Sequence, residues 1–143
     1  MHTLKLQQAA EIIEVALAHA RDVGCPPMTV AVLDPGGHLL ALQREDRSGI
    51  LRPQIAQAKA WGALGMGHGS RFLAGRAEAA PAFFAALTDI SAGRIAPVPG
   101  GVLIRDSDGN ILGAVGVSGD LPDRDETCAV AGIDHLGLVA DVG

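Results

Sequence analysis

Residues 100–119, which read GGVLIRDSDGNILGAVGVSG, decide the fold. Two aliphatic runs, VLIR and ILGAVGV, flank an Asp-Ser-Asp-Gly-Asn segment that is typical of a tight turn. The second run has no polar residue, so we expect a central strand that is covered on both faces. Gly113 and Gly116 within it indicate that another backbone or a ligand comes close. The stretch therefore predicts a core hairpin that opens onto a small polar corner at Ser118 and Gly119.

A second hairpin is predicted upstream, where MTVAVLD (28–34) and HLLALQR (38–44) are joined by Pro-Gly-Gly. The rest of the chain shows helical spacing or glycine-rich connections. We expect helices at residues 3–23 (capped by Thr3), 50–65, 81–90 (packed on the core) and from Asp123 to about Val139, a further strand at 95–98, and a mobile loop or short helix, a possible lid, at 65–76.

Hairpins rather than crossovers link the clear strands, which argues for an antiparallel sheet. The sequence therefore predicts an α+β fold, with a central antiparallel sheet of about five strands flanked by helices. At 143 residues we expect one domain over 1–143. Because 48% of the residues are hydrophobic, surplus apolar surface is expected to be covered in a homo-oligomer.

Composition and charge count against several classes of partner. The chain has a net charge of −5 and only three Phe, one Trp and no Tyr, which disfavours nucleic-acid binding. Its apolar runs are too short to span a bilayer, so no membrane partner is expected. The N-terminal residues lack the pattern of a signal peptide, and we expect a cytoplasmic protein. Cys25 and Cys128, without metal-site spacing, are expected to be buried thiols.

Several charged residues are candidates for binding or catalysis. Arg44 and Asp46 follow a strand, where the Arg fork could grip a carboxylate or form a local surface pair with Asp46. Lys59, in an Ala- and Gly-rich helix, could approach a ligand or could lay its stem along apolar surface. Asp125 lies near a helix N-terminus, where the dipole favours it, and Asp123 with Glu126 has capping-box spacing.

Topology suggests that some of these groups meet. We expect Arg44, Lys59, the amides of Gly100 and Gly101, and the corner at Ser118 and Gly119 to converge on one anion-binding cleft, because antiparallel neighbours place strand ends beside strand starts. His19, near the end of the first helix, is either a cation favoured by the helix dipole or a ligand of a haem iron or other metal.

The blocks VAVLDPGGHLLALQRED, QAKA and PGGVLIRDSDGNILGAVGVSG together resemble the GlcG/HbpS family, which includes the C-terminal domain of PduO-type proteins. The resemblance covers nearly the whole chain and implies a profilin-like fold, a dimer-built oligomer and, in some members, haem binding or haem-linked sensing. The positions that match the family pattern are Arg44, Asp46, Lys59, Gly100, Gly101, Ser118, Gly119 and Asp125.

Three functions follow from these features. The first is a small-ligand-binding protein that binds or handles haem, with His19 as the candidate ligand of the iron. The second is an enzyme acting on a small carboxylate metabolite by isomerase-like or lyase/hydrolase-like acid/base chemistry, with Lys59, Asp46 or Asp125 moving protons. The third is a non-catalytic accessory or scaffold protein, in which the same motifs serve only the fold.

Overall fold

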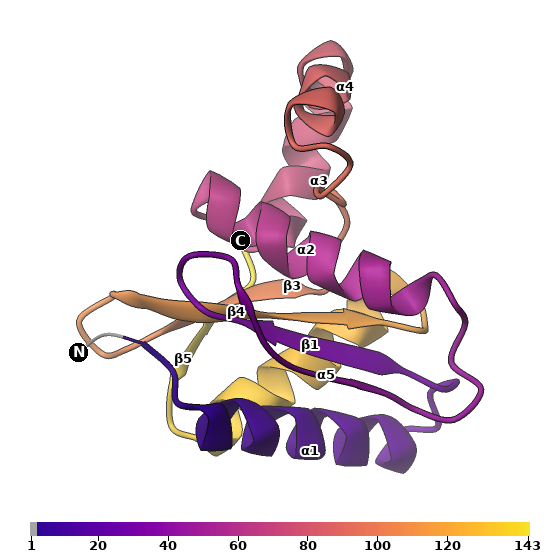
Figure 1. The fold of residues 1–143 in the computed structure, drawn as a ribbon, viewed down its shortest axis with the longest axis vertical. Helices are drawn as coiled ribbons and strands as arrows, with labels where there is room; N and C mark the ends of the chain where they lie inside the picture. Colours follow the sequence, from indigo (N-terminus) through magenta and orange to yellow (C-terminus); the bar gives the residue numbers. More distant parts are fainter. Residues whose placement is uncertain (1–2) are drawn as a thin grey trace.

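The computed structural model describes residues 3–143, and within them five helices surround one five-stranded antiparallel sheet (Figure 1). The strand order is β2-β1-β4-β3-β5. This confirms the predicted α+β fold. The elements are α1 (Leu6–Asp22), β1 (Thr29–Leu33), β2 (Leu39–Arg44), α2 (Arg52–Met66), α3 (Ser70–Ala79), α4 (Pro81–Ile90), β3 (Gly101–Arg105), β4 (Ile111–Ser118), α5 (Pro122–His135) and β5 (Val139–Asp141).

Strand β4 is the centre of the sheet, as its all-apolar sequence predicts. It pairs with β3 on one side and with β1 on the other, and residues 112–118 are all buried. The two glycines mark close approaches of other backbones. A Cβ on Gly116 would collide with the carbonyl oxygen of Ala56 in α2, and one on Gly113 would collide with that of Leu33 in β1. These positions accept only glycine without movement of a neighbouring element.

The helices form one layer on each face of the sheet. Helix α2 crosses β4, β1 and β3 on one face, while α1 and α5 pack together on the other face (Figure 1). The larger part of the core lies between the sheet and α1 with α5, and includes Ile12, Ile13 and Ile133. A smaller cluster lies under α2 and includes Leu33 and Leu103. Both faces of the central strands are therefore shielded from solvent, which explains their unbroken apolar runs.

Helices α3 and α4 form an arm that projects from the α2 side of the sheet (Figure 1). Part of the expected loop or short helix at 65–76 is helical, because α3 begins at Ser70. The expectation that residues 81–90 pack on the core is wrong. Phe84 is the one buried residue of α4, and Phe83 and Ile90 are 53% and 75% exposed. The apolar sequence of α4 does not reflect core packing within this chain.

Two predicted helix boundaries and one predicted strand are also wrong. Helix α1 begins at Leu6 with Lys5 in the cap position, instead of at Thr3. Residues 95–98 form no strand and belong to the connection that precedes β3. Helix α5 ends at His135 because Gly137 adopts a left-handed φ of +69°, and the chain then returns as the edge strand β5.

Of the remaining local predictions, the capping box is wrong and the two buried thiols are confirmed. Asp123 and Glu126 do not form a capping box: Leu121 is the cap of α5, and both carboxylates pair with Arg71 of α3 instead. Cys25 and Cys128 are free and buried, as expected. Among the described residues, no helix has the length and apolar character needed to cross a bilayer.

Candidate functional site

A buried ion pair joins the two helical layers around the end of β4. Lys59 lies on the sheet-facing side of α2 and Asp125 in the first turn of α5, and their side chains are 3% and 1% exposed. The Nζ atom of Lys59 lies 2.9 Å from Oδ2 of Asp125 and donates a second hydrogen bond, also 2.9 Å long, to the carbonyl of Val117. The other oxygen of Asp125 accepts a hydrogen bond from the amide of Asp120. Each charged group thus has two partners.

Burial dominates the electrostatics of this pair. Desolvation lowers the pKa of Lys59 although the neighbouring carboxylate of Asp125 opposes the shift. Desolvation likewise raises the pKa of Asp125 against the opposing effect of Lys59. The two pKa shifts have the same cause. The attraction between the two charges offsets only part of the free-energy cost of removing them from water.

The glycine-rich corner packs directly on Lys59. A Cβ on Gly100 would lie 2.8 Å from Nζ of Lys59, and one on Gly101 would collide with the carbonyl of the same lysine. The amide of Gly101 donates to Oγ of Ser70 at 2.7 Å. Its N–H is therefore used within the chain. The glycines here let α2 approach the start of β3.

Ser118 and Gly119 complete this corner at the end of β4. Ser118 is fully buried, and its Oγ accepts a hydrogen bond of 3.0 Å from Nη1 of Arg52. Gly119 has a φ of +158°, and a Cβ there would press on Met28. Six of the sequence-predicted residues thus lie around the end of β4: Lys59, Gly100, Gly101, Ser118, Gly119 and Asp125.

Arg44 lies two strands away from this corner. Thr29 of β1 pairs with Arg44 of β2 on one side and with Ser118 of β4 on the other, so their Cα atoms are separated by about 10 Å, two strand spacings. The guanidinium of Arg44 donates to the carbonyl of Ser48 at 2.7 Å. The hydroxyls of Ser48 and Thr29 share a hydrogen bond of 2.8 Å. A chain of polar contacts therefore runs along this end of the sheet.

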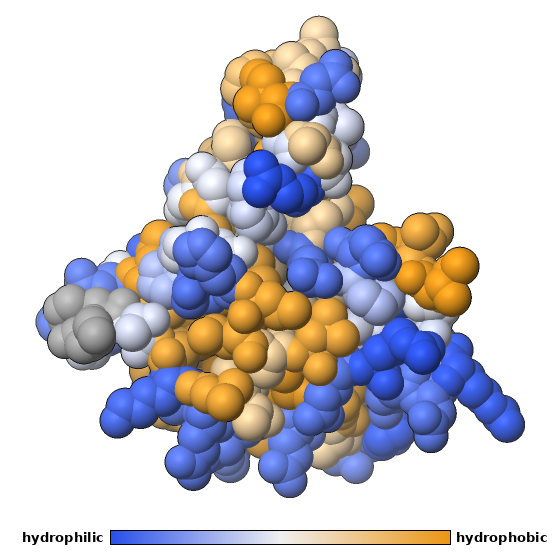
Figure 2. Space-filling model, viewed as in Figure 1, coloured by the Kyte–Doolittle hydropathy of each residue, from blue (hydrophilic) through white to orange (hydrophobic). Residues whose placement is uncertain are grey.

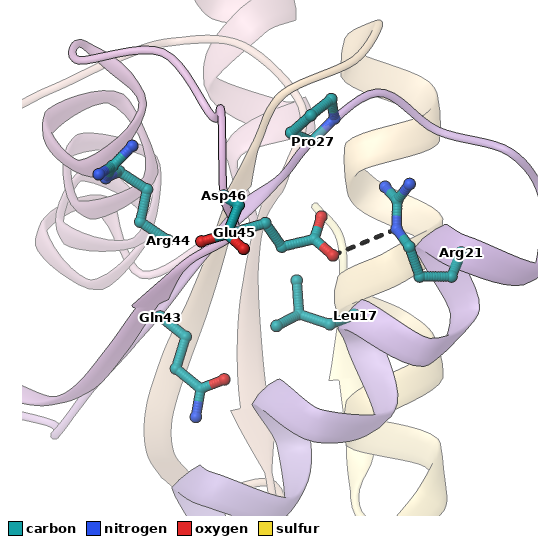
Figure 3. A pocket seen from close by; sticks show the side chains of 7 residues that line it. All are labelled: Leu17, Arg21, Pro27, Gln43, Arg44, Glu45 and Asp46. Atoms are coloured by element: carbon teal, nitrogen blue, oxygen red, sulfur yellow. Dashed lines mark ion pairs between the residues drawn. The ribbon is translucent and has the colours of Figure 1, made fainter.

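Arg44 and Asp46 open onto a cleft of about 470 Å³ between α1 and the end of β2, here called the Arg44 cleft (Figure 3). The side chains of Arg44 and Glu45 point in opposite directions, and Glu45 reaches towards Arg21 of α1 (Figure 3). Arg21 and Glu45 form an ion pair of 3.2 Å. The cleft is lined by Leu17, Arg21, Pro27, Gln43, Arg44, Glu45 and Asp46.

Arg21 and Glu45 carry no signal in the sequence that marks them as site residues. Arg21 follows Leu17 by one helical turn, which is a signal for a shared face but not for which strand that face meets. The lining of the Arg44 cleft contains neither Lys59 nor Ser118. The structure thus separates the sequence-predicted residues into an exposed group at this cleft and a buried group around Lys59.

His19 lies in the last turn of α1 and is half-exposed. It is outside the lining of the Arg44 cleft. Two other histidines have partners, since Nδ1 of His38 lies 3.2 Å from Asp34 and the ring of His68 stacks on Phe72 with centroids 4.1 Å apart. In the part of the chain that the structure describes, no three His, Cys, Asp or Glu side chains are grouped to hold a metal ion.

Solved structures share this fold over nearly the whole chain. The PduOC haem complex is 21% identical, with a TM-score of 0.86, and the alignment covers 96% of this chain and 97% of that one. Protein ORFY of Klebsiella pneumoniae is 24% identical, with a TM-score of 0.87 and coverage of 96% and 92%. HbpS of Streptomyces reticuli, as a double mutant, is 29% identical, with a TM-score of 0.83 and coverage of 96% and 89%.

A search among curated proteins gave no match. The family described as "Haem degrading protein HbpS-like" matches residues 4–134, which include every helix and strand from α1 to β4 and all of α5 except its last residue. The match confirms the resemblance drawn from the LDPGGHLL and GAVGVSG blocks. The chain therefore belongs to the HbpS-like family.

Proposed function

We propose that this protein binds a small anionic ligand, with haem as the first candidate, in an assembly of several copies. The observation that carries the proposal is the Arg44 cleft, at which Arg44 is exposed and has no carboxylate partner among the described residues. A planar guanidinium with free N–H groups suits a carboxylate such as a haem propionate. Membership of the HbpS-like family and the fold shared with the PduOC haem complex support this choice of ligand.

A single copy of the chain offers candidate ligands for haem but does not enclose it. Within the described residues the imidazole of His19 has no hydrogen-bond partner, so we propose it as a ligand of the iron, and Arg44 as a ligand of a propionate. Haem would supply an iron centre, whose reactivity depends on its axial ligands and on the polarity around it. Because His19 lies outside the Arg44 cleft, one copy does not enclose a porphyrin. We therefore propose that a second copy completes the site.

Exposed apolar side chains support the assembly. Ile50 is 89% exposed, Leu51 67%, and Ile90 on the arm 75%. Figure 2 shows apolar side chains gathered over the middle of one face, above a border of hydrophilic ones. Surfaces of this kind favour contact between copies. Sedimentation at micromolar concentration is expected to show a species heavier than the 14.6 kDa chain, and a monomer alone would contradict the proposal.

The ligand is tested by titrating the purified protein with hemin and recording the Soret band. We expect a saturable shift that His19→Ala changes in shape and that Arg44→Ala weakens, because one removes an iron ligand and the other a propionate ligand. His135→Ala is the matched control, since His135 is another solvent-accessible histidine in the last turn of a helix. A spectrum without a shift, or one that both site variants leave unchanged, would overturn the proposal.

The enzymatic alternative has less support from the geometry. It requires a substrate to reach Lys59 or Asp125, whose side chains are at most 3% exposed and do not line the Arg44 cleft. A general acid or base has to come within hydrogen-bonding reach of its substrate. We therefore infer that the Lys59–Asp125 pair supports the fold, and that ligand binding is the activity of this chain.

A further inference from the structure

A second cleft lies on the α2 side of the sheet, between α2, the turn of the β1–β2 hairpin and the connection from α4 to β3. Its volume of about 400 Å³ is in the range of small-molecule sites. Neither Arg44 nor His19 lines it, so it is distinct from the haem site proposed above. The residues of this cleft, here called the Trp61 cleft, are Leu33, Gly37, Gln54, Gln57, Ala58, Trp61, Ala92, Gly93 and Arg94.

The lining of the Trp61 cleft is positively charged, although the chain carries a net charge of −5. It contains one guanidinium, two carboxamides and one indole, and no carboxylate. The carboxamides of Gln54 and Gln57 and the indole of Trp61 follow one stripe of α2 at helical spacing. In a cleft without acidic residues, Arg94 attracts anions rather than cations.

Arg94 is held in place by two contacts. Its guanidinium carbon lies 4.2 Å from the centre of the Trp61 ring, and its Nε donates to the carbonyl of Ser91 at 2.8 Å. Neither contact uses the two Nη atoms, and among the described residues nothing accepts a hydrogen bond from them. An arginine fixed at Nε with both Nη groups free is organised in advance for a carboxylate.

The backbone beside Arg94 adopts an unfavourable conformation. Ala92 and Gly93, which both line the cleft, have left-handed φ values of +55° and +78°. This conformation is unfavourable for alanine, because its Cβ approaches the carbonyl oxygen. Such residues are concentrated at binding sites. Here they turn the chain sharply after α4, and Arg94 follows directly.

From these contacts we propose that the Trp61 cleft binds a small carboxylate that has a planar, unsaturated or aromatic body. The carboxylate accepts hydrogen bonds from the Nη atoms of Arg94. The body lies against Leu33 and Trp61, the two large apolar side chains of the lining. The carboxamide of Gln54, which has no partner among the described residues, is available to a polar substituent. This site is additional to the haem site and does not depend on it.

Trp61 is itself the reporter for the test, because the chain has one tryptophan and no tyrosine. The purified protein is titrated with benzoate, a planar carboxylate, and with benzamide, its neutral analogue, while tryptophan emission is recorded. We expect saturation with benzoate and a Kd at least about tenfold weaker with benzamide, since charge-assisted hydrogen bonds are the strong ones. Arg94→Gln should weaken benzoate binding by a similar factor. Arg76→Gln, an exposed arginine outside the cleft, is the control and should bind as wild type does.

Two further measurements keep the outcomes distinct. Arg94→Lys retains the charge without the fork, and we expect it to bind benzoate more tightly than Arg94→Gln does. Arg94→Gln should give the wild-type hemin titration, which separates failure at this cleft from failure of the haem proposal. The proposal is overturned if benzoate gives no saturable change up to about 20 mM, well above a millimolar Kd. Equal binding of benzamide and benzoate would overturn it as well.

Discussion

The buried Lys59–Asp125 pair allows a sharp prediction about stability. In Lys59→Met the methionine fills a similar volume, but Asp125 is left as a buried carboxylate without its cation. Breaking one partner of a buried ion pair costs about 3–5 kcal/mol in the free energy of unfolding. For a chain of 143 residues this corresponds to a fall of about 10–17 °C in Tm. Thermal unfolding followed by circular dichroism at fixed protein concentration measures the effect.

The same pair predicts a pH dependence. Burial raises the pKa of Asp125 above its value in the unfolded chain, so the folded state binds the proton more tightly and stability falls as pH rises through that window. In Lys59→Met the opposing effect of the lysine is lost, and the pKa of Asp125 should rise further. The Tm deficit of Lys59→Met should therefore become smaller as the pH is lowered from about 7 towards 5.

The double variant Lys59→Met/Asp125→Leu decides whether the cost comes from the unpaired charge. Replacing a buried ion pair with apolar residues of similar size is often neutral or stabilising. We expect the double variant to unfold at a higher temperature than Lys59→Met and to lose the pH-dependent deficit. The single variant Asp125→Leu completes the comparison. If the stability losses of Lys59→Met and Asp125→Leu simply add in the double variant, or if Lys59→Met costs less than about 1 kcal/mol, the coupling inferred from the 2.9 Å contact is wrong.

Two further predictions concern buried positions. Burial, together with the neighbouring Cys25, raises the pKa of Cys128 to about 12. In a Cys25→Ser background the burial remains, so the Cys128 thiol should still resist a thiol reagent near pH 8 and react only after unfolding in urea; fast reaction of the folded protein would contradict this. Gly116→Ala should destabilise the protein by several kcal/mol, because its Cβ would collide with the backbone of Ala56. Gly75→Ala, in open space on a helix, should stabilise the protein by about 0.5–1 kcal/mol. Urea unfolding compares the two variants, and equal unfolding midpoints would refute the argument.

The parts of the fold that were predicted correctly depend on local chemistry. The Asp-Ser-Asp-Gly-Asn turn and the apolar run after it define β3 and β4 without reference to the rest of the chain. The close approaches at Gly113 and Gly116 were also foreseen, because glycine weakens a buried strand unless a neighbour needs the space that a side chain would fill. The identity of the approaching backbones, Leu33 and Ala56, depends on topology and came only from the structure.

The errors arise where distant segments decide the outcome. Apolar spacing at 81–90 predicts a core helix, yet α4 packs on α3 in the projecting arm, and the pattern does not distinguish a core from another partner. The last helix is predicted to run to about Val139, but Gly137 ends it earlier and residues 139–141 pair with β3 instead. The Lys59–Asp125 contact joins residues 66 apart in sequence, so neither residue alone indicates it.

The contacts also explain why the family resemblance indicates the fold more firmly than the ligand. Lys59, Gly100 and Gly101 match the family pattern, and each is occupied in holding α2 against the sheet. A resemblance built on such residues identifies how the layers close. The groups left free to bind a ligand are of another kind, since Arg94 lies outside every block of the resemblance and Arg44 is the exposed member of its motif. Differences in ligand between proteins of this fold should therefore follow from the residues that line the two clefts.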